Sequence, residues 1–78
     1  MMAKAFVRVC VEVGKERGVR DGLRLFDEVE MAEMTSGEQD VIAIVHGSSF
    51  EDILTFVQSR LRQFTGIKVT WTNFILET

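Results

Sequence analysis

Hydrophobic and polar residues alternate strictly along the first part of the chain, from Lys4 to Val13. A period of two residues is typical of a β-strand that buries one face. Gly14 follows and ends the pattern, so the sequence predicts a first strand over Lys4–Val13. The predicted buried face carries Ala5, Val7, Val9, Val11 and Val13, and the other face carries Lys4, Phe6, Arg8, Cys10 and Glu12.

Two later segments follow a helical period instead. Residues 15–28 predict a helix with Val19, Leu23 and Phe26 on its apolar side. Gly18 and Gly22 lie beside this stripe, where we expect close approach of a neighbouring backbone.

The second helix is predicted to begin at a capping box, in which Ser48 is the N-cap and Glu51 follows three residues later. Gly66 is expected to end it. Its apolar stripe consists of Phe50, Ile53, Leu54, Val57, Leu61 and Phe64.

Three further strands complete the pattern. Val29–Thr35 alternates poorly and carries two Met and two Glu, which suits an edge strand. Val41–His46 is apolar on both faces, which indicates a central strand that is covered on both sides. The last strand, Ile67–Leu76, has Ile67, Val69, Trp71 and Ile75 on one face, and Thr70, Thr72, Phe74 and Leu76 on the other.

This order of elements predicts an α+β protein with the ferredoxin-like βαββαβ arrangement. In that fold a four-stranded antiparallel sheet carries both helices on one face. The opposite face is then left in water, although it is expected to carry Phe6, Cys10, Phe74, Leu76 and one parity of Val41–Val45. An exposed apolar patch of this kind marks an interface. We therefore predict a dimer made by face-to-face packing of two sheets, with the edge at Val29–Thr35 available for further assembly.

Size and composition narrow the possible functions. The chain of 78 residues is expected to form one domain over residues 1–78, and a domain this small benefits from oligomerisation. One cysteine excludes an internal disulfide, and the lack of an export signal predicts a cytoplasmic location. A net charge of -3 argues against direct nucleic-acid binding, and no apolar run is long enough for a membrane span.

The chain carries few groups suited to catalysis. His46 is the only histidine, and no partners stand near it at a metal-binding spacing. Cys10 lies mid-strand without a nearby activating group, and the arginines Arg17, Arg20 and Arg24 share their helix with acidic residues. We expect neither an enzyme nor a bound metal or cofactor.

The segment Ser36–Asp40 is the best candidate for a binding site. Gly37 allows backbone N–H groups to approach a ligand carboxylate, and Asp40 supplies a negative charge for an ammonium group. Spacing alone favours a plain hairpin turn. Thr70 and Thr72 share one strand face and offer hydroxyl groups, although Thr is also a good strand former.

Three stretches together resemble the effector-binding domain of the leucine-responsive regulator (Lrp/AsnC) family, called RAM for regulation of amino-acid metabolism. They are AFVRVCVEVGKE, SGEQDVIAIV and FEDILTFVQSRLRQFTGIKVTWTNFIL. The resemblance implies sheet-paired dimers that assemble into rings, with amino-acid effectors bound between dimers near the Gly37–Asp40 loop. It assigns ligand binding first to Gly37 and Asp40, then to Glu38, Gln39, Thr70 and Thr72. Gln39 stands where the family usually has an aromatic residue, and Thr65 where proline is common.

The chain leaves no room for the N-terminal winged-helix domain of family regulators, so the resemblance implies a stand-alone RAM protein. We expect a non-enzymatic, amino-acid-responsive oligomer that can co-assemble with a full-length Lrp/AsnC regulator and does not itself bind DNA. Two alternatives remain. One is a purely structural assembly partner, and the other is a dimeric α+β-barrel enzyme that would depend on His46.

Overall fold

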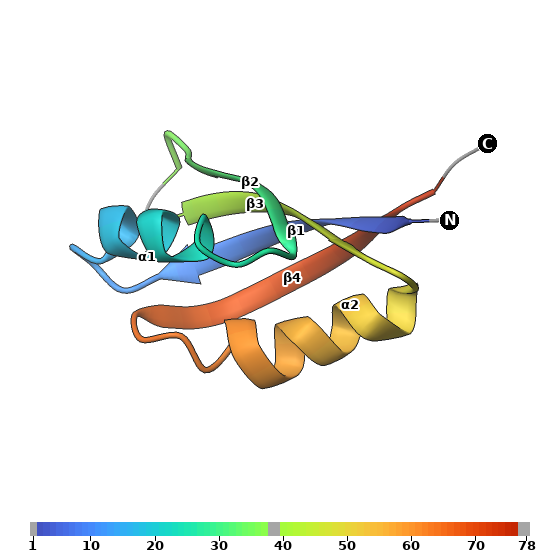
Figure 1. The fold of residues 1–78 in the computed structure, drawn as a ribbon. Helices are drawn as coiled ribbons and strands as arrows, with labels where there is room; N and C mark the ends of the chain where they lie inside the picture. The colour runs from blue at the N-terminus through green and yellow to red at the C-terminus, as the bar shows by residue number, and fades with distance from the viewer. Residues whose placement is uncertain (1, 38–39, 77–78) are drawn as a thin grey trace.

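The computed structural model describes residues 2–37 and 40–76, which form one α+β layer structure (Figure 1). The strands are β1 (Ala3–Val11), β2 (Val29–Met34), β3 (Asp40–Gly47) and β4 (Ile67–Ile75). The helices are α1 (Glu16–Leu23) and α2 (Phe50–Phe56), and α2 continues into one turn of π-helix, η1 (Val57–Leu61). This order confirms the predicted βαββαβ arrangement.

The four strands form one antiparallel sheet in the order β2-β3-β1-β4. β2 therefore lies at an edge and β3 lies inside the sheet, as their compositions predict. Both helices pack on the same face of the sheet (Figure 1), which we call the covered face. None of the helices within residues 2–37 and 40–76 has the length and apolar content that a bilayer crossing requires.

The alternating residues of β1 build the centre of the core. Their partners in β3 and in the helices are equally buried, because cross-strand neighbours share a face. Val13 does not join them: β1 ends at Val11, the chain turns at Gly14 (φ 84°), and Val13 is 76% exposed. The core includes Ala5, Val7, Val9, Val11, Val41, Ala43 and Val45 from the sheet, with Val19, Leu23, Ile53 and Leu61 from the helices.

The face assignment predicted for the last strand is wrong. Phe74 pairs with Ala5 and therefore lies on the covered face, where its ring stacks on Phe50 at 4.3 Å between centroids. Leu76 follows the end of β4 and is 73% exposed. The opposite face, which we call the bare face, carries the apolar side chains of Phe6, Cys10, Ile42, Ile44, Val69, Trp71 and Ile75.

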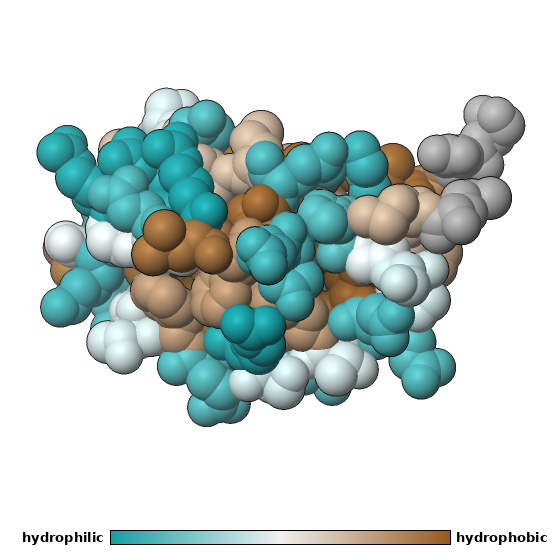
Figure 2. Space-filling model, viewed as in Figure 1, coloured by the Kyte–Doolittle hydropathy of each residue, from teal (hydrophilic) through white to brown (hydrophobic). Residues whose placement is uncertain are grey.

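The start of α2 is also one residue later than predicted. Ser49, not Ser48, is the N-cap, and its hydroxyl accepts a hydrogen bond from the Asp52 backbone N–H at 3.1 Å. The buried stripe of this helix includes Phe56, which the sequence pattern missed, while Phe50 and Leu54 are each 39% exposed. Apolar and polar side chains consequently share the outer surface of this small domain (Figure 2).

Candidate functional site

Asp40 opens β3 and closes the turn that joins β2 to β3. The Thr35 backbone N–H donates to the Asp40 carbonyl at 3.2 Å, so this segment does form the hairpin that its spacing predicts. Asp40 nevertheless differs from an ordinary turn residue. It is 8% exposed, and it is the one charged residue that is buried among those described.

The Asp40 carboxylate is held by Arg8 of β1. Both Nε and Nη2 of Arg8 donate to the same oxygen, Oδ2, at 3.2 and 2.9 Å. The other oxygen, Oδ1, is buried and has no hydrogen-bond partner within residues 2–37 and 40–76. A buried carboxylate is costly unless it is paired, so Arg8 explains why the charge is tolerated. Oδ1 remains as an acceptor without a donor.

Trp71 of β4 supports the same arginine from its other side. Arg8 and Trp71 are direct cross-strand partners, and the guanidinium lies 4.9 Å from the centre of the indole ring. This is the geometry of a cation–π interaction. Asp40, Arg8 and Trp71 therefore form a row across β3, β1 and β4 on the bare face, which we call the Asp40–Arg8–Trp71 row.

Gly37 lies against this row because nothing larger fits there. A Cβ at residue 37 would lie 3.0 Å from Asp40 Oδ2 and 3.5 Å from Thr35 Oγ1. Its φ is outside the left-handed region, so close approach of the turn to the carboxylate, and not backbone freedom, explains the glycine. The structure thus brings Gly37 and Asp40 together, whereas Glu38 and Gln39 lie outside the described residues.

Thr70 and Thr72 do not join them in the same protomer. They pair with Val9 and Val7, so both lie on the covered face of β4, partly buried. Asp40 pairs with Cys10 and lies on the bare face. The six candidate residues of the sequence therefore fall on two sides of the sheet, and their roles in ligand binding stay predictions.

Sequence reasoning missed Arg8 and Trp71 as members of this site. Arg8 precedes Asp40 by 32 residues, and only the pairing of β1 with β3 brings them together. The alternation of β1 correctly placed Arg8 on the face opposite the core. That polar position, beside a buried acid on the neighbouring strand, was the available signal.

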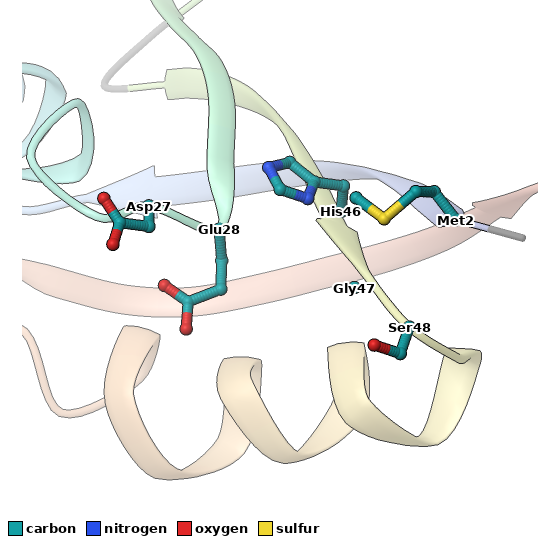
Figure 3. Close-up of a pocket in the computed structure, with 6 residues that line it drawn as sticks. All are labelled: Met2, Asp27, Glu28, His46, Gly47 and Ser48. Atoms are coloured by element: carbon teal, nitrogen blue, oxygen red, sulfur yellow. The ribbon is translucent and has the colours of Figure 1, made fainter.

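His46 lies at a second location, an open pocket of about 280 Å³ at the end of β3 (Figure 3). Glu28 points toward α2, where it pairs with Arg60 at 3.2 Å, and Asp27 turns away from the imidazole. Across residues 2–37 and 40–76, no three His, Cys, Asp or Glu side chains lie close enough together to hold a metal ion. The pocket is lined by Met2, Asp27, Glu28, His46, Gly47 and Ser48.

Comparison with known families decides the relationship. Residues 4–78 match the model of the Lrp/AsnC ligand binding domain. The chain belongs to this family. The resemblance seen in its sequence is thereby confirmed.

Relatives of this Lrp/AsnC domain include regulators of transcription. Over 72 residues it is 32% identical to YugG of Bacillus subtilis (strain 168), an uncharacterized HTH-type transcriptional regulator. The match takes in 86% of this chain and 43% of YugG, so the chain spans less than half the length of that curated relative.

Two solved structures share the fold of the Lrp/AsnC domain. FFRP-DM1 superposes with a TM-score of 0.88 at 30% identity, over 95% of this chain and 99% of its own. The complex of the transcriptional regulator NMB0573 from Neisseria meningitidis with L-Met superposes with a TM-score of 0.83 at 22% identity, over 96% and 50% of the two chains. The family and these relatives indicate a regulatory role and not an enzymatic one.

Proposed function

We propose that this Lrp/AsnC domain is an amino-acid-responsive oligomeric regulatory protein. It binds a small amino-acid effector beside Gly37 and Asp40, between dimers, and modulates a full-length Lrp/AsnC regulator. The observation that carries the proposal is Asp40 itself, a buried carboxylate with one oxygen paired to Arg8 and one oxygen without a donor. NMB0573, a protein of the same fold, forms a complex with L-Met, which supports an amino acid as the ligand class.

Asp40 has the chemistry for an ammonium group. A carboxylate oxygen accepts more than one hydrogen bond, and bonds from a charged donor are stronger than those between neutral groups. A ligand ammonium bound at Oδ1 would satisfy the acceptor that the described residues leave open. Because Oδ1 is buried, the neighbouring side chains have to shift when the ligand enters.

The positions of Thr70 and Thr72 support a pocket that is shared between copies. Their hydroxyl groups lie on the covered face of β4, and the Asp40 carboxylate lies on the bare face. One protomer cannot bring both sets to one small molecule. A contact between two dimers, with Asp40 from one copy and Thr70 and Thr72 from another, would do so.

The bare face supports the first step of that assembly, the dimer. Its apolar side chains are partly open to water, with Phe6 at 38% and Trp71 at 47% exposed. Its cations are already paired within the protomer, Lys4 with Glu30 at 3.0 Å and Arg8 with Asp40 at 2.9 Å. Packing two such faces together therefore buries apolar surface without leaving an unpaired charge, which is the costly case.

Isothermal titration with each standard amino acid tests the sensor function. We expect at least one amino acid to bind the wild-type oligomer at millimolar concentration or below, and Asp40→Asn to abolish the heat. Asp27→Asn is the matched control, since it removes a carboxylate from the His46 pocket. If no amino acid binds, the sensor function is wrong for this chain. If Asp27→Asn abolishes binding and Asp40→Asn does not, the site lies in the other pocket.

Solution mass tests the assembly. Phe6 on the bare face and Leu54 on α2 are almost equally exposed, at 38% and 39%, so Phe6→Asp and Leu54→Asp form a matched pair. We expect Phe6→Asp to yield monomers by sedimentation while Leu54→Asp retains the wild-type mass. The reverse result would place the dimer interface on the helices.

Native mass spectrometry of a mixture with a full-length Lrp/AsnC regulator tests the partner. We expect mixed oligomers from the wild type and none from Phe6→Asp, because the same face serves both contacts. Ligand binding and self-assembly without mixed species would leave a sensor that does not act through this partner.

A further inference from the structure

We propose that Arg8 binds the carboxylate of the effector and makes this site specific for ligands with a free carboxylate group. This inference rests on the proposed function, because it assigns one end of the proposed ligand. It also changes the expected binding mode. The sequence assigns the carboxylate to backbone N–H groups of the loop, whereas the structure offers a guanidinium.

One edge of the guanidinium is engaged and the other is open. Nε and Nη2 both donate to Asp40 Oδ2, while Nη1 makes no hydrogen bond within the described parts of the chain. The Arg8 side chain is 53% exposed, so the edge that carries Nη1 faces solvent. Arginine presents its donors as a planar fork that matches a carboxylate in two parallel hydrogen bonds. The open edge has the donors for this interaction.

Arg8 is held in place before any ligand arrives. Its partner carboxylate on Asp40 is 10% exposed, whereas the carboxylates that pair with Lys4, Arg20, Arg24 and Arg60 are 35–57% exposed. Trp71 lies under the same guanidinium at 4.9 Å. A side chain that is fixed on two sides loses less conformational freedom on binding, so the interaction retains more of its strength.

The charges of the pair also complement an amino acid. Arg8 and Asp40 present one positive and one negative group side by side, and an amino acid carries one of each on neighbouring atoms. A ligand can lie antiparallel to the pair, with its carboxylate on the open edge of Arg8 and its ammonium toward Asp40. An unpaired Asp40 would instead attract any amine, with or without a carboxylate.

The test compares each amino acid that binds with its carboxamide, which keeps the ammonium and the side chain but lacks the carboxylate charge. Titrations use the wild-type oligomer, Arg8→Gln, Arg8→Lys and, as a control for loss of a surface cation, Arg62→Gln. We expect the carboxamide to bind the wild type about tenfold to a hundredfold more weakly than the amino acid. Arg8→Gln should weaken the amino acid by a similar factor and leave the carboxamide unchanged. Arg8→Lys should recover part of the loss, and Arg62→Gln should change neither ligand.

The possible failures separate the two proposals. If no amino acid binds the wild type, the proposed function and this inference both fail. If the amino acid and its carboxamide bind the wild type equally, Arg8 does not read the carboxylate, although the sensor function stands. This comparison needs no variant and holds even where Arg8→Gln fails to fold. If Arg8→Gln changes the ligand-free mass and weakens both ligands equally, the open edge serves a contact between copies, and the inference is wrong.

Discussion

Gly22 of α1 packs directly against the ring of Phe64, so closely that a Cβ on residue 22 would overlap the ring. Phe64 in turn packs edge-on against Phe26, with 6.2 Å between ring centroids. Gly18, one turn earlier in the same helix, has open space where its Cβ would lie. Of the two glycines beside the apolar stripe, only Gly22 is required by packing, and its neighbour is a side chain and not a backbone.

This difference predicts opposite effects of alanine at the two positions. Gly22→Ala should lower the free energy of unfolding by about 1–3 kcal/mol, because Phe64 has to move out of a packed position. Gly18→Ala should raise it by about 0.5–1 kcal/mol, since alanine restricts the unfolded chain and fits the helix. Urea unfolding at one fixed protein concentration measures both. Equal effects would contradict the close contact at Gly22.

The N-cap of α2 predicts a second contrast. Ser49→Ala should destabilise the protein by about 1 kcal/mol, because the Asp52 backbone N–H loses its acceptor. Ser48→Ala should stay within about 0.5 kcal/mol of the wild type. Thermal unfolding of the two variants compares them directly. A larger loss for Ser48→Ala would move the helix start back to the position that the capping box predicts.

The end of β1 gives a third test. Val11 is fully buried and Val13 is 76% exposed, although both continue the same alternation. Val11→Ala should cost about 2 kcal/mol through lost burial and the cavity left behind. Val13→Ala should change stability by less than about 0.5 kcal/mol. Similar losses at both positions would extend the buried face beyond Gly14.

The stacked pair Phe50 and Phe74 predicts a coupling energy. Their rings lie 4.3 Å apart at 25°, so they belong to the same side of the sheet. A double-mutant cycle with Phe50→Ala and Phe74→Ala should give a coupling of about 0.5–1.5 kcal/mol. Strictly additive losses would return Phe74 to the bare face.

The elements of the fold were predictable because each has a clear period. The alternation of β1, the weak pattern of β2 and the apolar run of β3 all identify strands and their places in the sheet. The faces of β4 were not predictable, because both of its parities carry apolar residues. Its register with β1, including a shift between Cys10 and Val11, decides which residues face the helices.

Local ends were less certain for a related reason. Ser48 and Ser49 are each followed three residues later by an acidic residue, so the sequence contains two possible caps. After α1 the backbone tightens, with Leu25 N–H donating to the Gly22 carbonyl and Phe26 N–H to that of Leu23. The helix therefore ends at Leu23 while Phe26 still reaches the core.

The candidate site divides in the same way. Gly37 and Asp40 are close in sequence, and their proximity follows from one turn. Arg8 and Trp71 reach Asp40 only through the pairing of three strands, which no local pattern encodes. The opposite placement of Thr70 and Thr72 likewise follows from the register of β4.

The neighbouring positions of β1 and β4 have a consequence for how the chain folds. Residues 3–11 pair with residues 67–75, so the first and last described strands meet across almost the whole chain. Such distant pairing raises the contact order, and a high contact order slows folding. During synthesis, β1 leaves the ribosome long before β4 and keeps one edge unpaired until β4 arrives. The Arg8–Trp71 contact therefore forms only when the sheet is completed by its last strand.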